Sequence, residues 1–177
     1  MLTGQNISLR LVEREDLGLR VEWINDKETN DMFGFDWPAS LGKTQNWYNQ
    51  SLNDGSKVHL VVVDNETNRV IGMAGLIDVN YRHRHAEVYI TIGDKDFRGK
   101  GLAKEVLDLI NNYGFVDLGL ERLYAYNFTY NIPSQKSFES VGYIKEGVMR
   151  KHKYKNGELR DINIYGLLKE EWRREHV

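Results

Sequence analysis

The most informative stretch of the sequence is Asp96-Phe97-Arg98-Gly99-Lys100-Gly101-Leu102-Ala103, which joins a β-rich run to an amphipathic helix. Its two glycines can adopt backbone angles closed to other residues and let a ligand approach the main chain. The start of the helix leaves N–H groups without partners, and the helix dipole favours an anion there. Arg98 and Lys100 add positive charge. The stretch therefore predicts a cradle for a phosphate group.

Three phosphate ligands compete for this cradle. A nucleotide P-loop is excluded, because five residues separate Gly93 from Gly99 and Gly101 follows Lys100 in place of the hydroxyl that binds magnesium. The dinucleotide fingerprint is excluded, because Lys104 stands where its third glycine belongs. A pyrophosphate held by backbone N–H groups remains.

The hydropathy pattern on both sides of this loop predicts the other elements. Alternating or β-rich runs predict strands at residues 7–12, 57–64, 70–79, 86–92, 122–126, 143–149 and 159–168. Helices are predicted at residues 16–25 with Asp16 as the cap, at 41–52 with Ser40 as the cap, from Leu102 onward, and after the cap Asn131. Residues 27–39 are predicted to be a loop. This order predicts an α+β domain whose mixed sheet has helices on its faces.

Composition excludes several classes of protein. The chain has 177 residues, 41% of them hydrophobic, which suits one domain with a real core. It has no cysteine, so disulfides, cysteine zinc sites and a cysteine nucleophile are excluded. A formal net charge of -2 gives no strong attraction to nucleic acid or to an acidic membrane. We find neither a signal peptide nor an apolar run long enough to span a membrane, and we expect a cytoplasmic protein.

The loop resembles a known family of enzymes. Arg98, Gly101 and Ala103 match the Q/R-x-x-G-x-G/A motif of the GNAT superfamily, the Gcn5-related N-acetyltransferases. The resemblance covers nearly the whole chain, through Gly72-Met73-Ala74-Gly75-Leu76, Ala86-Glu87-Val88-Tyr89-Ile90 and Asn131-x-x-Ser134-x-x-x-Phe138-x-x-x-Gly142-Tyr143. Later landmarks are similar to the ribosomal-protein alanine and spermidine N-acetyltransferases, namely Glu146-Gly147, Asn156-Gly157, Asp161 and Tyr165.

The resemblance implies a fold, a reaction and a cofactor site. It implies one N-acetyltransferase domain over residues 1–177, with a mixed, mostly antiparallel sheet flanked by helices. Acetyl-coenzyme A would be the co-substrate, with its pyrophosphate on the backbone N–H groups of Phe97, Arg98, Gly99, Lys100, Gly101, Leu102 and Ala103. Ile90 and Ile92 would offer backbone hydrogen bonds to the pantetheine amides. Asn131 would contact the pantetheine arm or the adenine side.

Acetyl transfer to an amine needs a base, stabilisation of an oxyanion and a proton for the departing thiolate. Glu87 is the predicted base by resemblance, although a surface carboxylate at a strand start is an equal alternative. The family's usual acid is a tyrosine at the position of Phe138, which has no proton to donate. Ser134 is the predicted acid by resemblance, with helix capping as the alternative. A third alternative needs no protein acid, because a thiolate is a tolerable leaving group.

The acceptor is left open by the sequence. Residues 13–36 hold eight acids and three bases, which suits a cationic amine such as a polyamine. Residues 145–160 hold six Lys or Arg and two Glu, which suits an acidic acceptor. Charge runs are usually solvated faces, so we expect only a small-molecule or N-terminal amine acceptor and no nucleic acid, membrane or metal. The oligomeric state is expected to be a monomer or a homodimer. The alternative function is a non-catalytic coenzyme A binding module.

Overall fold

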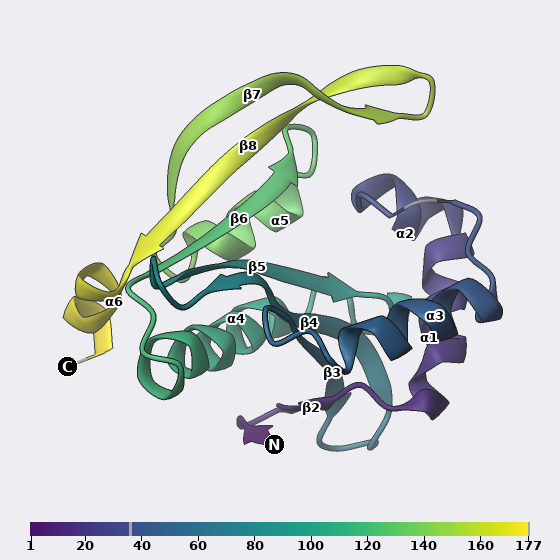
Figure 1. Cartoon of the computed structure of the whole chain (residues 1–177), viewed down its shortest axis with the longest axis horizontal. Coiled ribbons are helices and arrows are strands. Elements are labelled where there is room, and N and C mark those ends of the chain that lie inside the picture. Colours follow the sequence, from purple (N-terminus) through teal and green to yellow (C-terminus); the bar gives the residue numbers. More distant parts are fainter. Residues whose placement is uncertain (36, 177) are drawn as a thin grey trace.

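The computed structural model describes residues 1–35 and 37–176 (Figure 1). Its strands are β1 (Leu2–Thr3), β2 (Ile7–Leu11), β3 (Val58–Asp64), β4 (Val70–Asn80), β5 (His85–Ile92), β6 (Arg122–Phe128), β7 (Ile144–Lys155) and β8 (Glu158–Leu168). Its α-helices are α1 (Leu17–Asn25), α2 (Lys27–Met32), α3 (Leu41–Ser51), α4 (Leu102–Asn112), α5 (Ile132–Glu139) and α6 (Lys169–His176).

The strands form one sheet in the order β1-β2-β3-β4-β5-β6-β8-β7. Every neighbouring pair is antiparallel except β5 and β6, which are parallel. The expectation of a mixed, mostly antiparallel sheet flanked by helices is therefore confirmed. The elements predicted from hydropathy are present in the predicted order.

Two apolar clusters cover the two faces of the sheet. The larger one packs the buried stripe of α4, which includes Val106, Leu107 and Ile110, against strands β2 to β6. The smaller one packs Trp23 of α1 and Tyr48 of α3 against β3 and β4. Because side chains alternate along a strand, β5 contributes to both faces.

The parallel pair β5 and β6 separates after a short contact. Its pairing runs from His85 opposite Arg122 to Glu87 opposite Tyr124. Beyond Glu87, β5 stays paired with β4 as far as Ile92, whereas β6 stays paired with β8 as far as Phe128. Figure 1 shows β6 and β8 rising away from β5. The sheet therefore forks at Glu87.

A long hairpin of β7 and β8 extends over this fork (Figure 1). Asn156 and Gly157 form its tip, with φ angles of 52° and 83°, as predicted for a tight hairpin turn. The tip is held by α2: the Asn156 side-chain amide donates to the Asp31 carboxylate over 2.7 Å, and the Lys155 ammonium donates to the Asn30 side-chain carbonyl. We call residues 151–160 the arm.

Several local predictions were wrong. Residues 27–39 are not all loop, because Asp26 accepts a hydrogen bond from the Thr29 N–H over 2.9 Å and starts α2. Asp16 does not cap α1 with its side chain; its carboxylate accepts from the Glu13 N–H and pairs with Arg10, each over 2.8 Å. The strand predicted to end at residue 149 continues as β7 to residue 155. β1 and α6 were not predicted.

The caps of two other helices were predicted correctly. The Ser40 hydroxyl accepts from the Lys43 N–H over 3.3 Å at the start of α3. The Asn131 side chain accepts from the Ser134 N–H over 3.2 Å at the start of α5.

Candidate active site

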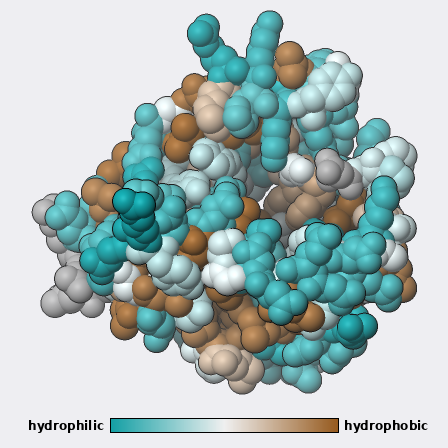
Figure 2. Space-filling model, in the orientation of Figure 1, coloured by the Kyte–Doolittle hydropathy of each residue, from teal (hydrophilic) through white to brown (hydrophobic). Residues whose placement is uncertain are grey.

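A cleft of about 530 Å³ lies at the fork of the sheet, on the face covered by α1 and α3. Its walls come from β3 to β8, from α1, α3 and α5, and from the end of α2 with the segment that follows it. Figure 2 shows a hollow between the hairpin and the body of the molecule, with a hydrophilic rim. We call this cavity the acceptor cleft.

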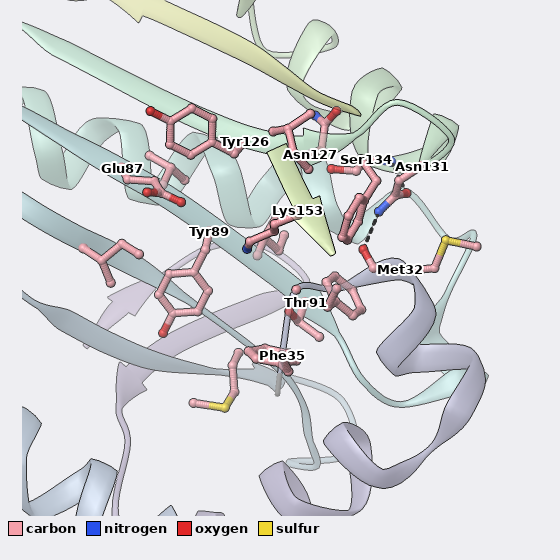
Figure 3. A pocket seen from close by; sticks show the side chains of 18 of the residues that line it. Met32, Phe35, Glu87, Tyr89, Thr91, Tyr126, Asn127, Asn131, Ser134 and Lys153 are labelled. Carbon is pink, nitrogen blue, oxygen red and sulfur yellow. Dashed lines mark hydrogen bonds between the residues drawn. The ribbon is translucent and has the colours of Figure 1, made fainter. Parts of the chain in front are cut away.

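Glu87 lies in the wall of the acceptor cleft, at the last residue pair before β5 and β6 separate. Burial raises the pKa of its carboxyl to about 7, and the charge of Asp78 adds to this, whereas Lys153 opposes it. A carboxyl with a pKa near 7 is half ionised at neutral pH, as a general base requires. Figure 3 shows Glu87 and Tyr89 projecting from β5 on the same side.

The glycine loop begins where β5 ends. Gly99 and Gly101 have φ angles of 73° and 76°, in the left-handed region that favours glycine. A Cβ built at either position would meet nothing within 4 Å, so the space beside each of these glycines is open. Gly101 is the residue before α4, an eleven-residue helix whose first N–H groups lack partners in the helix. The loop thus has the geometry of an anion cradle.

The two cations of the loop have different surroundings. The Lys100 ammonium lies 4.7 Å from the centre of the Phe97 ring, and Phe97 is itself buried. The Arg98 guanidinium instead donates to the carbonyl oxygens of Ile92 and Gly93, over 3.0 and 3.1 Å, and to the Thr29 hydroxyl over 2.6 Å. Arg98 therefore ties the loop to β5 and α2.

The remaining residues expected to bind the cofactor lie near the fork. Ile90 and Ile92 are half-buried and pack against the core on the α4 side, and Ile90 also lines the acceptor cleft. The Ile92 carbonyl is the one that accepts from Arg98. Leu102 packs against the same core at the start of α4. The structure thus brings these residues to one end of β5.

Asn131 and Ser134 lie across the fork from β5, on α5 and its cap (Figure 3). The Asn131 side-chain amide donates to the Met32 carbonyl over 3.0 Å, so this residue holds α2 as well as capping α5. Ser134 lines the acceptor cleft. Helix capping was the alternative role for Ser134, but the cap of α5 is the Asn131 side chain, which accepts from the Ser134 N–H. Phe138 is 2% exposed and packs on Tyr143 at 5.0 Å between ring centres.

Several polar side chains of the acceptor cleft were not predicted from the sequence. The His59 ring Nδ1 lies 2.7 Å from the Tyr89 hydroxyl, and burial together with Arg20 and Lys57 lowers the pKa of His59 to about 4. His59 is therefore neutral at physiological pH. Alternation along β5 could have found Tyr89, two residues after Glu87. No pattern in the sequence connects α1 or β3 with this cleft.

Two further side chains reach the cleft from β6 and from the arm. Tyr126 lines the wall near Glu87, and burial followed by the Glu87 charge raises the pKa of its phenol. The Lys153 ammonium packs so closely on Gly34 that a side chain at Gly34 would collide with it. Figure 3 shows Lys153 entering the cleft.

The comparisons with known proteins agree with this geometry. Residues 6–144 match the family model described as the acetyltransferase (GNAT) domain, so the chain belongs to the GNAT family of acetyltransferases. It is an acyltransferase, and acetyl-coenzyme A is its co-substrate. Among the described residues, none of the helices is long and apolar enough to cross a membrane.

The particular relatives include amine acetyltransferases. The chain is 28% identical to the spermidine N(1)-acetyltransferase of Vibrio cholerae serotype O1, over 96% of each chain. It is 34% identical to the putative ribosomal N-acetyltransferase YdaF of Bacillus subtilis, over 59% of this chain and 56% of that one. The crystal structure of the Vibrio cholerae spermidine N-acetyltransferase with CoA and spermine superimposes with a TM-score of 0.89 at 26% identity, covering 95% of this chain and 98% of that one.

Proposed function

We propose that this enzyme transfers an acetyl group directly from acetyl-coenzyme A to a primary amine bound in the acceptor cleft, with Glu87 as the general base. The observation that carries this proposal is the position of Glu87 at the fork, with a pKa of about 7. An ammonium ion must lose a proton before its nitrogen can attack a thioester. Glu87 accepts that proton, directly or through water.

One side of the fork binds the acetyl donor and the other side binds the acceptor amine. The backbone N–H groups of residues 97–103 hold the pyrophosphate of the donor at the start of α4. The acceptor enters from the face covered by α1 and α3, where the cleft opens. Ile90, Ile92 and Asn131 hold the rest of the donor along the unpaired edge of the fork. The acyl carbon and the amine nitrogen then meet near Glu87.

Completion of the reaction needs a proton for the thiolate of coenzyme A. Ser134 is the proposed donor, because it lines the acceptor cleft and Asn131 already caps its helix. The amine nitrogen gains the acetyl group and the carbon–sulfur bond breaks. The thiolate takes a proton from the Ser134 hydroxyl, and the Ser134 oxygen takes the second proton of the amine nitrogen, so the serine is not left as an alkoxide. Tyr126 is a second candidate for this step, because its hydroxyl belongs to the same cleft.

Release of free thiol from acetyl-coenzyme A tests the function. We expect steady-state release with at least one member of a panel of polyamines, amino sugars and peptides with free N-termini. The polyamines belong in the panel because of the Vibrio cholerae relative, and the peptides because of the Bacillus subtilis one. A protein that binds acetyl-coenzyme A but releases no thiol with any amine would be the non-catalytic module instead. The need for acetyl-coenzyme A also favours a cytoplasmic location.

A further inference from the structure

Arg20 is the cation of the acceptor cleft whose surroundings the proposed function does not explain. Its guanidinium lies 4.0 Å from the centre of the Trp47 ring and 5.3 Å from that of Phe35. Burial lowers the pKa of this guanidinium. Among the described residues, no carboxylate lies within 4.0 Å of it.

A half-buried guanidinium that has no carboxylate among its described neighbours is costly for a fold to keep. Removing a cation from water without an anion beside it is unfavourable, and contact with aromatic rings offsets only part of that cost. Arginine is also the side chain best suited to bind a carboxylate or a phosphate, because its planar fork donates two parallel hydrogen bonds. A bound anion would therefore complete the surroundings of Arg20.

Most of the other charged side chains of the acceptor cleft are also cations. The cleft is lined by Lys57 and Lys153, whereas Glu87 is the one acid among its described lining residues. Lys57 has Asp54 as a partner at 2.7 Å, but the described part of the chain gives Lys153 no carboxylate within 4.0 Å. Because Glu87 takes up a proton in the reaction, the described residues of the cleft offer no fixed anion to a second ammonium group.

Three of the acids of residues 13–36, the segment that had suggested a polyamine, pair with cations elsewhere in the fold. Asp16 pairs with Arg10 at 2.8 Å. Asp26 pairs with Lys95 at 2.9 Å, and Glu28 pairs with Lys95 at 3.1 Å. None of the acids at positions 13–31 lines the acceptor cleft, and Asp36 lies outside the described residues. The described acids of this segment therefore do not supply the cleft with negative charge.

We propose, on the basis of the proposed function, that the acceptor amine also carries a carboxylate or phosphate group and that Arg20 binds it. The amine end lies at Glu87, and the anionic end lies on the Arg20 side of the cleft, against Trp47 and Phe35. Lys153 adds a second positive charge from the arm. A diamine would bring its distal ammonium towards these cations and would bind poorly. The acceptor therefore differs in charge from the spermine bound by the Vibrio cholerae relative.

Amines matched in length and differing in charge test the substrate class. Wild-type enzyme is assayed for thiol release with ω-amino carboxylates and ω-aminoalkyl phosphates of two to six carbons, and with the diamine and the alkylamine of each length. We expect the best anionic amine to exceed its matched diamine at least 10-fold in kcat/KM. The carboxylate and phosphate arms then show which anion is bound. A diamine preferred over both anionic amines at every length would overturn the proposal.

Variants of Arg20 test the residue. In Arg20→Gln, the ratio of kcat/KM for the anionic amine to that for the matched alkylamine falls at least 10-fold, through KM for the amine, whereas KM for acetyl-coenzyme A is unchanged. Arg20→Lys restores part of that ratio, and Arg20→Met keeps the packing on Trp47 without the charge. Arg82→Gln, an exposed cation at the turn before β5, is the control. Equal ratios in the wild type and all four variants, or a rise in KM for acetyl-coenzyme A alone, would contradict the assignment.

A binding measurement separates this proposal from the proposed function. The melting temperature of the wild-type enzyme saturated with coenzyme A is recorded with 4-aminobutanoate, 2-aminoethyl phosphate and 1,4-diaminobutane, and again for Arg20→Gln. We expect a rise with an anionic amine that disappears in the variant. If the enzyme releases thiol with a diamine and its melting temperature shows no Arg20-dependent rise, the proposed acetyl transfer stands and the anionic acceptor is refuted. Such a rise without any thiol release would refute the acetyl transfer alone.

Discussion

The two sides of β5 are built in different ways. On the donor side, one continuous stretch forms the cradle, and its working atoms are main-chain N–H groups around Gly99 and Gly101. On the acceptor side, the cleft is made of side chains from α1, α3, α5 and the strands β3 to β8. A backbone cradle tolerates changes in most side chains, whereas one substitution can change the charge of a cleft. Relatives can therefore share the donor and differ in the acceptor.

The largest expected effect is the loss of the base on the acceptor side. Glu87→Gln keeps the shape of the side chain but cannot accept a proton, so we expect kcat to fall about 1000-fold, within the range typical of a general base. Wild-type kcat/KM should rise with pH through an apparent pKa near 7, and the variant should lack this limb. Rapid-mixing or steady-state assays from pH 5 to 9 measure both.

The control for this variant is Glu66→Gln, an exposed change in the turn between β3 and β4. It should keep wild-type rates and the wild-type pH profile. An unchanged KM for acetyl-coenzyme A in Glu87→Gln would show that the donor side is independent of the base. A variant with wild-type kcat would remove Glu87 from the mechanism.

The next effect should fall on the donor side alone. Gly101→Asp puts a side chain at a φ of 76° and a negative charge beside the pyrophosphate, so we expect affinity for acetyl-coenzyme A to fall about 100-fold. Calorimetric titration of the folded protein measures this. Gly119→Asp is matched in backbone demand, with a φ of 65°, but lies in the loop before β6, and it should keep wild-type affinity. Equal losses in both variants would indicate strain in the fold instead.

A smaller effect is expected on the free energy of unfolding, through ionisation of the Glu87 carboxyl. Because the folded state raises the pKa of Glu87 from 4.5 to about 7, ionisation favours the unfolded chain. The wild type should lose stability as the pH rises from about 4.5 to 7, and the loss should persist above pH 7. Glu87→Gln should therefore be about 2 kcal/mol more stable at pH 8 and no more stable at pH 4. Urea unfolding at both pH values measures the free energy of unfolding of the variant and the wild type. A gain in stability of equal size at pH 4 would indicate an effect of packing and not of ionisation.

The smallest effect should come from Ser134. Ser134→Ala removes the proposed proton donor of the thiolate but keeps the N–H that Asn131 accepts, so we expect kcat to fall about 10-fold and the melting temperature to stay unchanged. Tyr126→Phe is the matched comparison in the same cleft. A loss confined to Tyr126→Phe would move the acid to β6, and wild-type rates in the double variant would leave the thiolate to depart without a protein acid.

Elements that depend on local patterns were predicted correctly from the sequence. They are the β-rich runs at residues 57–64 and 70–79, the caps Ser40 and Asn131, and the turn Asn156-Gly157, each set by residues near one another in the chain. The donor loop, and with it the family, could also be predicted from the sequence, because a glycine at positive φ and a helix start depend on contiguous residues. Such features can be predicted without knowledge of the tertiary structure.

Roles that depend on distant partners could be assigned only from the tertiary structure. Arg98 was expected to add positive charge to the cradle, and its guanidinium also donates to the hydroxyl of Thr29, 69 residues away. Asp16 was expected to cap a helix, and Arg10 competes for its carboxylate. The contact of Asn156 with Asp31 spans 125 residues and closes the arm over the cleft. The burial and the electrostatic surroundings of a side chain depend on all the elements that pack around it. Those elements come together only when the sheet has formed.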